Sequence, residues 1–187
     1  MLRETFWSLI AITRDRSRNP LEQTDQLRKR LRDLSREEIL GFDYWLQDAL
    51  RRSYRADWWA TAYVALGGCS DDAFEAFRGW VISRGRAIFE AALEDPDVLI
   101  YELSRLQSWA DAELPEMRAI AWRAFKEKTG GDYPEAARRF DEALRHYEPD
   151  EIAYPDLHFP WKAQMPESLQ RICPRVFAHF YHQPLAG

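Results

Sequence analysis

Apolar residues recur at every third or fourth position over most of the chain, which is the spacing that gathers them on one face of an α-helix. Glycine occurs only eight times and stands mostly between these periodic segments. No segment shows the strict alternation of apolar and polar residues that marks a half-buried strand. The pattern predicts an all-α protein with about eight to nine helices.

Local signals fix several helix ends. Asn19 followed by Pro20 is typical of a helix start, because asparagine caps free amides and proline at the first helical position loses no hydrogen bond. Ser35 with Glu38 three residues later predicts a capping box. Gly67 is expected to end a later helix, since glycine readily takes the left-handed conformation found there.

The same periodicity predicts further helices over residues 4–15, 86–95, 97–112, 115–129 and 133–147. From Pro149 onward the composition changes, since six of the ten prolines lie in this last part of the chain. We therefore expect residues 149–187 to form a Pro-rich tail that wraps the body, with a short helix at 174–182. No internal repeat is visible, so the whole chain, 1–187, is interpreted as one compact single-domain helical bundle.

Composition supports a globular protein, since 46% of the residues are hydrophobic and 30% are charged. No run approaches the roughly 18 apolar residues of a membrane span, and the first residues do not resemble a secretion signal. A cytoplasmic protein is expected. Cys69 and Cys173 belong to no CxxC pair, so a zinc framework has no support, although a single disulfide between them stays open.

The net charge of −5 is unevenly distributed along the chain. Residues 28–36 are basic, whereas residues 90–116 carry eight acidic side chains against a single base. A basic helix face on an acidic chain is typically a solvated surface, so nucleic acid is not the expected partner. Because the chain carries a basic and an acidic patch, self-association stays open.

The stretch 67–80, "GGCSDDAFEAFRGW", crowds a thiol, a hydroxyl and two carboxylates together. Helix architecture explains most of it: Ser70 is the expected N-cap, and Asp71 and Asp72 then meet the positive end of the helix dipole. Cys69 is a poor nucleophile candidate, because the neighbouring carboxylates oppose formation of its thiolate.

Helix architecture does not explain two features of this region. A stripe of small residues, Asp72, Ala76, Gly79 and Ser83, allows either another backbone or a ligand to approach closely, and helix crossing is the favoured interpretation. The opposite, core-facing stripe is expected to comprise Phe74, Phe77, Trp80, Val81 and Ile88. If Arg78, Arg84 and Arg86 converge, they form an anion site, because guanidinium groups suit carboxylate and phosphate.

An aromatic and polar cluster precedes this stretch, at Tyr54, Asp57, Trp58, Trp59 and Tyr63. Adjacent tryptophans cannot both face inward on one helix, so one of them is expected to line a surface groove.

All four histidines lie in the C-terminal third, with His179 and His182 on one helical face. A metal site would need further ligands that the sequence does not supply, so we expect surface histidines, no metal site and no cofactor.

Three stretches together resemble a known family: "ETFWSLI", "SYRADWWATAYVALGGCSDDAFEAFRGWVISRGRAIFEAALEDPDVL" and "YPDLHFPWKAQMPESL". They are similar to the bacterial family called domain of unknown function 4240. The resemblance implies an autonomous bacterial domain whose signature is the long middle stretch. It implies no activity, cofactor or partner.

Two functions stay open. The leading hypothesis is a non-catalytic cytoplasmic binding or protein-interaction module that uses the surface around residues 54–86, with a protein or small molecule as partner and no membrane contact. The alternative is a small hydrolase- or transferase-type enzyme with a cation or anion site built from Asp71, Asp72, Glu75, Arg78 and Arg86. The full set of candidate surface residues is Tyr54, Asp57, Trp58, Trp59, Ser70, Asp71, Asp72, Glu75, Arg78 and Arg86.

Overall fold

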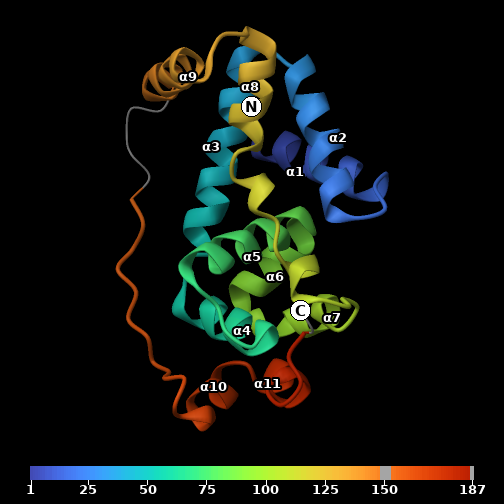
Figure 1. Ribbon diagram of the computed structural model, residues 1–187, viewed down its shortest axis with the longest axis vertical. Coiled ribbons are helices and arrows are strands. Elements are labelled where there is room, and N and C mark those ends of the chain that lie inside the picture. The colour runs from blue at the N-terminus through green and yellow to red at the C-terminus, as the bar shows by residue number, and fades with distance from the viewer. Residues whose placement is uncertain (148–152, 186–187) are drawn as a thin grey trace.

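The computed structural model describes residues 1–147 and 153–185, and within these ranges the protein is all-α, with no strand (Figure 1). The long helices are α1 (Arg3–Asp15), α2 (Pro20–Asp33), α3 (Arg36–Arg52), α4 (Ala56–Leu66), α5 (Asp71–Ser83), α6 (Arg86–Glu94), α8 (Ile120–Thr129) and α9 (Tyr133–Tyr147). Shorter elements are η1 (Pro96–Leu99), α7 (Ile100–Leu103), η2 (Trp109–Ala112), η3 (Pro115–Met117), α10 (Pro166–Ile172) and α11 (Pro174–Phe180).

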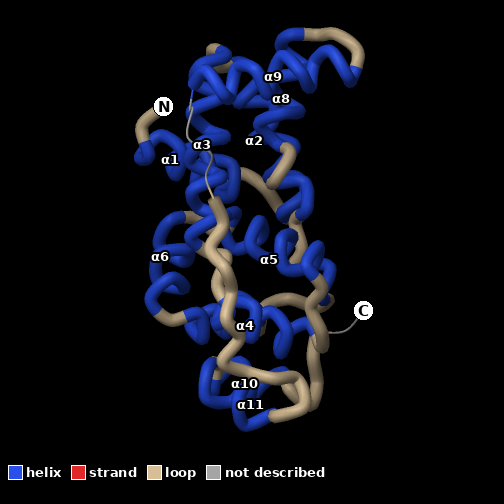
Figure 2. The backbone as a smooth tube through the Cα atoms, turned by 90° about the vertical axis from the view of Figure 1, so that its left-hand side faces the viewer, coloured by secondary structure: helices blue, strands red, loops and turns tan. Residues whose placement is uncertain are grey.

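The helices form an elongated body with one continuous hydrophobic core. At one end α2 and α3 pack against α8, and α9 covers α8 from outside (Figures 1 and 2). At the other end α10 and α11 pack against α4. Helix α5 lies between these groups, and its side chains Phe74, Phe77 and Trp80 are fully buried. The signature stretch therefore forms the centre of the core.

The predicted helix ends are confirmed where the signal is local. The Asn19 side chain accepts a hydrogen bond from the Glu22 amide (2.9 Å), and Ser35 and Glu38 form the expected capping box. Gly67 ends α4 with φ 73°, in the left-handed region. These ends need no long-range contact, which is why the sequence alone predicts them.

The predicted helix over residues 97–112 is wrong. The chain forms the short turns η1, α7 and η2 instead, because Ser108 and Asp111 make their own capping box and start a new turn. Likewise the segment after Pro115 begins as η3, and its α-helix starts only at Ile120.

Three further expectations need correction. Ile88 belongs to α6 and not to the core stripe of α5, since the chain turns at Gly85, whose φ is 97°. The tail holds α10 in addition to the expected short helix. The described residues contain eleven α-helical segments and three 3₁₀ turns, more than the eight to nine helices predicted. The predicted start of the tail, 149–152, and its end, 186–187, lie outside the described residues.

The small-residue stripe on α5 is a backbone crossing. The Leu114 amide donates to the Ala76 carbonyl oxygen at 3.0 Å, which draws the segment before η3 across the helix. A Cβ atom at Gly79 would stand 2.8 Å from the Leu114 carbonyl oxygen. The close approach of another backbone is therefore confirmed, but Leu114 and the short turn η3 cross α5, and not a further α-helix as the favoured interpretation held.

The C-terminal helices are held by a buried carboxylate. Asp97 in η1 is 2% exposed and accepts hydrogen bonds from the backbone amides of Arg175 (3.0 Å) and Val176 (2.8 Å), and from Arg175 Nε (2.9 Å). These amides are free first-turn donors of α11, so Asp97 satisfies the helix start from a distant part of the chain. Beyond α11, the Leu185 amide donates a hydrogen bond to the Ala65 carbonyl oxygen of α4.

A second buried carboxylate, Asp43 on α3, predicts a pH-dependent stability. Burial raises its pKa from 3.8 to about 7, so the folded protein holds this proton more tightly than the unfolded chain. The stabilisation is complete below the unfolded pKa and is lost as pH rises through the folded pKa. We expect Asp43→Asn to be more stable than the wild type by about 1–2 kcal/mol at pH 8, with the difference vanishing near pH 4, in urea unfolding. A wild type more stable than this variant at pH 8 would contradict the assignment.

Candidate functional site

An aromatic face lies on the surface at the junction of α3, α4 and α5; we define it by Tyr54, Trp59, Tyr63, Phe74 and Arg78. The Trp59 ring stacks on Phe74 with centroids 4.4 Å apart and an interplanar angle of 20°. Tyr54 packs beside both rings, at 6.3 Å from Trp59 and 6.0 Å from Phe74. Phe74 is fully buried, whereas Tyr54, Trp59 and Tyr63 are half-buried, so the face has an apolar floor and an accessible rim.

Of the two adjacent tryptophans, one side chain is buried and the other lies at the surface, as predicted. Trp58 is fully buried and its indole donates to Ala92 O at 3.0 Å. Trp59 points to the aromatic face, where its indole donates to Cys69 O at 3.0 Å. Helix geometry requires this division, because successive residues on a helix are about 100° apart.

Arg78 is the charged centre of the face. Its guanidinium carbon lies 4.9 Å from the Phe74 ring centroid and 5.0 Å from that of Tyr54, in cation–π geometry. Nη1 donates to Leu50 O at 2.6 Å, while the buried Nε has no partner among the described residues. The side chain is 4% exposed, and this burial lowers the pKa of Arg78. Aromatic rings, the Leu50 carbonyl, the Tyr154 side chain and the charge of Glu75 compensate this nearly buried cation in the described structure.

The chain itself covers this face. Residues 153–161, which we call the strap, run along the outside of the body towards α10 (Figures 1 and 2). Tyr154 meets Tyr54 edge to face at 5.0 Å, and Phe159 meets Trp59 in the same way at 5.4 Å. Trp161 packs on Tyr63 at 5.5 Å and donates to Ala56 O at 2.7 Å. Three strap aromatics therefore sit on three residues of the face.

The strap is attached more weakly than the rest of the tail. Tyr154 and Phe159 each remain 46% exposed. Within the described part, no backbone group of residues 153–161 makes a hydrogen bond to the body. Asp97 and the buried side chains of α10 and α11 anchor the chain after the strap, whereas the strap itself is held mainly by its aromatic side chains.

The predicted acidic residues do not gather in one place. Ser70 caps α5 by accepting from the Ala73 amide at 3.2 Å, and Asp71 and Asp72 are exposed in the first turn. Glu75 forms an ion pair with Arg118 at 2.9 Å. This stretch is therefore the start of a helix, as predicted from the Ser70 cap and the two aspartates that follow it.

The cysteines show no sign of reactivity. Burial raises the pKa of Cys69 to about 12, and the carboxylates of Glu113 and Asp71 act in the same direction. Both Cys69 and Cys173 are free thiols. The predicted effect of the neighbouring carboxylate is confirmed for Asp71, although burial is the larger cause.

The condition for an anion site built from Arg78, Arg84 and Arg86 is not met, because these arginines do not converge. Arg78 binds the Leu50 carbonyl, Arg84 binds Gln23, and the exposed Arg86 binds Glu90 on its own helix at 3.3 Å. The turn at Gly85 separates Arg86 from α5 and sends it to another surface. Asp57 is likewise engaged locally, because it pairs with Arg55 and accepts from the Trp58 amide at 2.9 Å.

The four histidines are exposed, as expected. Among residues 1–147 and 153–185, no three His, Cys, Asp or Glu side chains lie close enough together to hold a metal ion. Over the same residues, no helix has the length and apolar character needed to cross a membrane.

Sequence reasoning missed the strap aromatics, Asp97 and the surroundings of Arg84. Tyr154, Phe159 and Trp161 carry a visible signal, because large aromatics alternate with Pro155 and Pro160 in a segment without helical spacing. Such a segment cannot form a core of its own, so it has to pack on another surface. For Asp97 and Arg84 the sequence holds no comparable signal.

Comparison with known proteins gives one match. A family model described as "Protein of unknown function (DUF4240)" matches residues 1–127, which include the whole aromatic face but not the strap. Neither the curated proteins nor the solved structures contain a match to this chain.

Proposed function

Because the chain belongs to the DUF4240 family, whose description carries no activity, we propose its function from the geometry alone: it is a non-catalytic binding module. Its ligand is an extended segment of a partner protein, with aromatic side chains spaced by prolines, and this segment binds on the aromatic face. The single observation that carries the proposal is the strap, which occupies the face in the manner of a bound peptide.

The composition of the face supports a binding role. Tryptophan, tyrosine and arginine dominate the hot spots of protein interfaces, and here all three types surround one patch. An extended segment fits because the existing contacts are made by side chains at positions 154, 159 and 161, with no helix in the strap. Aromatic side chains also bury a large area at a small entropic cost, since each has only two rotatable bonds.

The enzyme alternative has less support. Asp71 and Asp72 are exposed at the start of α5, and Glu75 is bound to Arg118. Arg78 and Arg86 face different parts of the molecule. No observation favours a reaction at this surface over binding.

A peptide titration tests the proposal. The variant Tyr154→Ala/Phe159→Ala/Trp161→Ala should remain folded, because Tyr154 and Phe159 are largely exposed, Trp161 is only partly buried, and Asp97 anchors the helices that follow the strap. It should present an empty face. We expect a synthetic peptide with the sequence of residues 153–163 to bind this variant saturably in isothermal titration calorimetry. A peptide with its three aromatics replaced by alanine should not bind.

Two controls locate the binding. In the triple-variant background, Trp59→Leu should abolish binding, whereas Trp109→Ala, which removes a tryptophan 40% exposed elsewhere, should leave it unchanged. A folded triple variant that fails to bind the peptide would refute the proposal. A wild-type dimer that disappears in the triple variant would assign the face to the strap of a second copy, and so overturn the choice of a partner protein.

A further inference from the structure

We infer a second, separate binding site, for the phosphate group of a small molecule. It is a pocket of about 260 Å³ where the end of α1, the start of α2 and the end of α5 meet the segment 106–111. Arg14, Arg18 and Arg84 contribute three positive charges to its wall, against one carboxylate, Asp111. The aromatic face contributes no residue to it.

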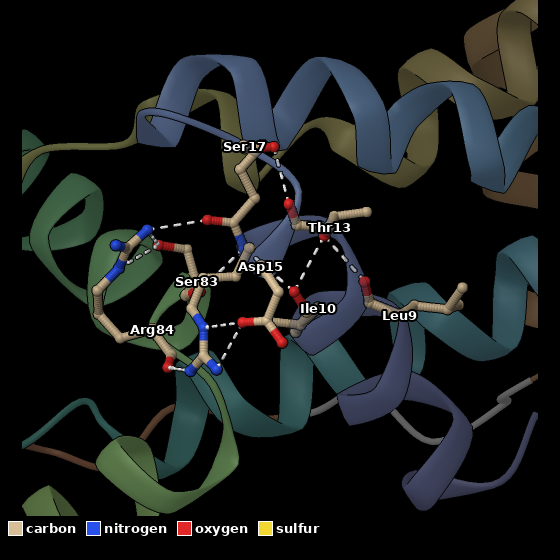
Figure 3. Close-up of polar contacts among 9 residues, drawn as sticks. Leu9, Ile10, Thr13, Asp15, Ser17, Ser83 and Arg84 are labelled. Carbon is tan, nitrogen blue, oxygen red and sulfur yellow. Dashed lines mark hydrogen bonds and ion pairs between the residues drawn. The ribbon is translucent and has the colours of Figure 1, made fainter.

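Arg84 is the main anion donor in the pocket. Its Nη2 donates to Gln23 Oε1 at 2.8 Å and to Ser83 Oγ at 2.9 Å, and Nε donates to Ser83 Oγ at 3.1 Å (Figure 3). Nη1 has no hydrogen-bond partner in the described residues, and no described carboxylate forms an ion pair with this arginine. These contacts hold the guanidinium in one orientation and leave part of its donor edge for a ligand.

The burial of Arg84 strengthens the case. The carboxylate that most favours the charged form of Arg84 is Glu102, which forms its own ion pair with Arg105 at 2.9 Å. Burial is the largest effect and lowers the pKa of Arg84, and the positive charge of Arg14 acts in the same direction. A cation that is partly removed from water is stabilised when an anion binds beside it.

The other arginines are partly engaged. Arg14 donates to the Arg84 carbonyl at 2.5 Å and pairs with Asp15 at 2.9 Å (Figure 3). Arg18 is highly exposed at the rim and pairs with Glu22 at 3.0 Å. The carboxylate of Asp111 is turned to the amides of Gln107 and Ser108, which it caps. Arg18 can therefore bind a ligand only by exchanging its bonds to Glu22, while Asp111 is held by its own loop.

Two neutral features also favour an anion. Trp80 is part of the wall and is 1% exposed, and its indole Nε1, which only donates, has no acceptor in the described structure. Asn19 and Pro20, at the start of the fourteen-residue helix α2, line the pocket as well, so the N-terminus of that helix lies at its wall, where Asn19 already caps the Glu22 amide. Phosphate suits this set better than a single carboxylate, because it accepts from several directions at once.

The test is a titration of the wild-type protein with inorganic phosphate and with glycerol 3-phosphate, each at constant ionic strength made up with chloride. Binding is followed by calorimetry and by the indole N–H resonances in NMR, with the Trp80 resonance assigned through Trp80→Phe. We expect saturable binding and a shift of the Trp80 resonance. Tighter binding of glycerol 3-phosphate would identify a phosphate monoester as the ligand type, and tighter binding of inorganic phosphate would identify the free ion.

The variants connect binding to the pocket. Arg84→Met should weaken phosphate binding at least about ten-fold, and Arg84→Lys, which keeps the charge but not the fork, should weaken it less. Arg86→Met makes the same charge change on the exposed face of α6 and should bind as the wild type does. The inference is overturned if the folded wild type shows no saturable phosphate binding, if the Trp80 resonance does not move, or if Arg84→Met and Arg86→Met weaken binding equally.

Discussion

Replacing Gly79 by valine is expected to destabilise the fold by about 3 kcal/mol, although glycine is a poor helix former. The physical reason is the crossing of α5 by the segment before η3, where the Leu114 carbonyl oxygen would stand 2.8 Å from any Cβ at this position. That oxygen belongs to the backbone, which the hydrogen bond from Leu114 N to Ala76 O holds in place, so it cannot move aside as a flexible side chain would. Urea unfolding measures the effect.

The control for Gly79 separates packing from helix propensity. Ala91→Gly on the exposed face of α6 should cost about 1 kcal/mol, the ordinary penalty of glycine in a helix. Gly79→Ala removes that same penalty, yet it should still destabilise the protein because of the contact with Leu114. A Gly79→Ala variant more stable than the wild type would show that the crossing is not as close as described.

The second large effect is expected at Asp97. Asp97→Ala removes three hydrogen-bond acceptor contacts that bind the start of α11 to η1, and it leaves two backbone amides without their partner. Bonds to a charged acceptor contribute about 1.5–3 kcal/mol each, so we expect a loss of about 3 kcal/mol or more in the free energy of unfolding. Hydrogen exchange should accelerate first in α10 and α11.

Arg175→Ala is the matched control. It removes the guanidinium, whose side chain is 44% exposed in its pairs with Asp95 and the buried Asp97, but keeps both backbone hydrogen bonds to Asp97. A loss of less than about 1 kcal/mol is expected, as for most surface ion pairs. If the two variants lose equal stability, the ion pair and not the capping of α11 holds the tail.

The predictable part of the fold is the part set by neighbouring residues. Asn19, Ser35 and Ser70 begin their helices through hydrogen bonds that span three positions, and the sequence displays both partners. Residues 97–112 have a helical apolar spacing, but their path depends on the Leu114–Ala76 hydrogen bond and on Asp97 binding to α11. Those partners are far away in sequence and could not be predicted, whereas the capping box of Ser108 and Asp111, which also interrupts this helix, is a local signal that the apolar spacing concealed.

For the candidate site, too, the sequence shows some features and not others. Trp59 and Arg78 are recognisable as candidates because an aromatic pair and an arginine with little local compensation both need an explanation. The sequence could not show that Arg78 lies under Tyr154, or that Arg84 is held by Gln23 on another helix. Residue type suggests the chemistry of a site, whereas the strap that covers it and the helices that orient it follow only from tertiary packing.

If a partner segment binds the aromatic face, the strap has to compete with it for that face. The most direct measurement is the dissociation constant of the labelled 153–163 peptide for the wild type and for the strap triple variant, by fluorescence anisotropy. Because the tethered strap acts as a high local concentration of competitor, we expect the wild type to bind the peptide at least about ten-fold more weakly. Equal affinity for both proteins would mean that the peptide binds elsewhere, and would contradict the account.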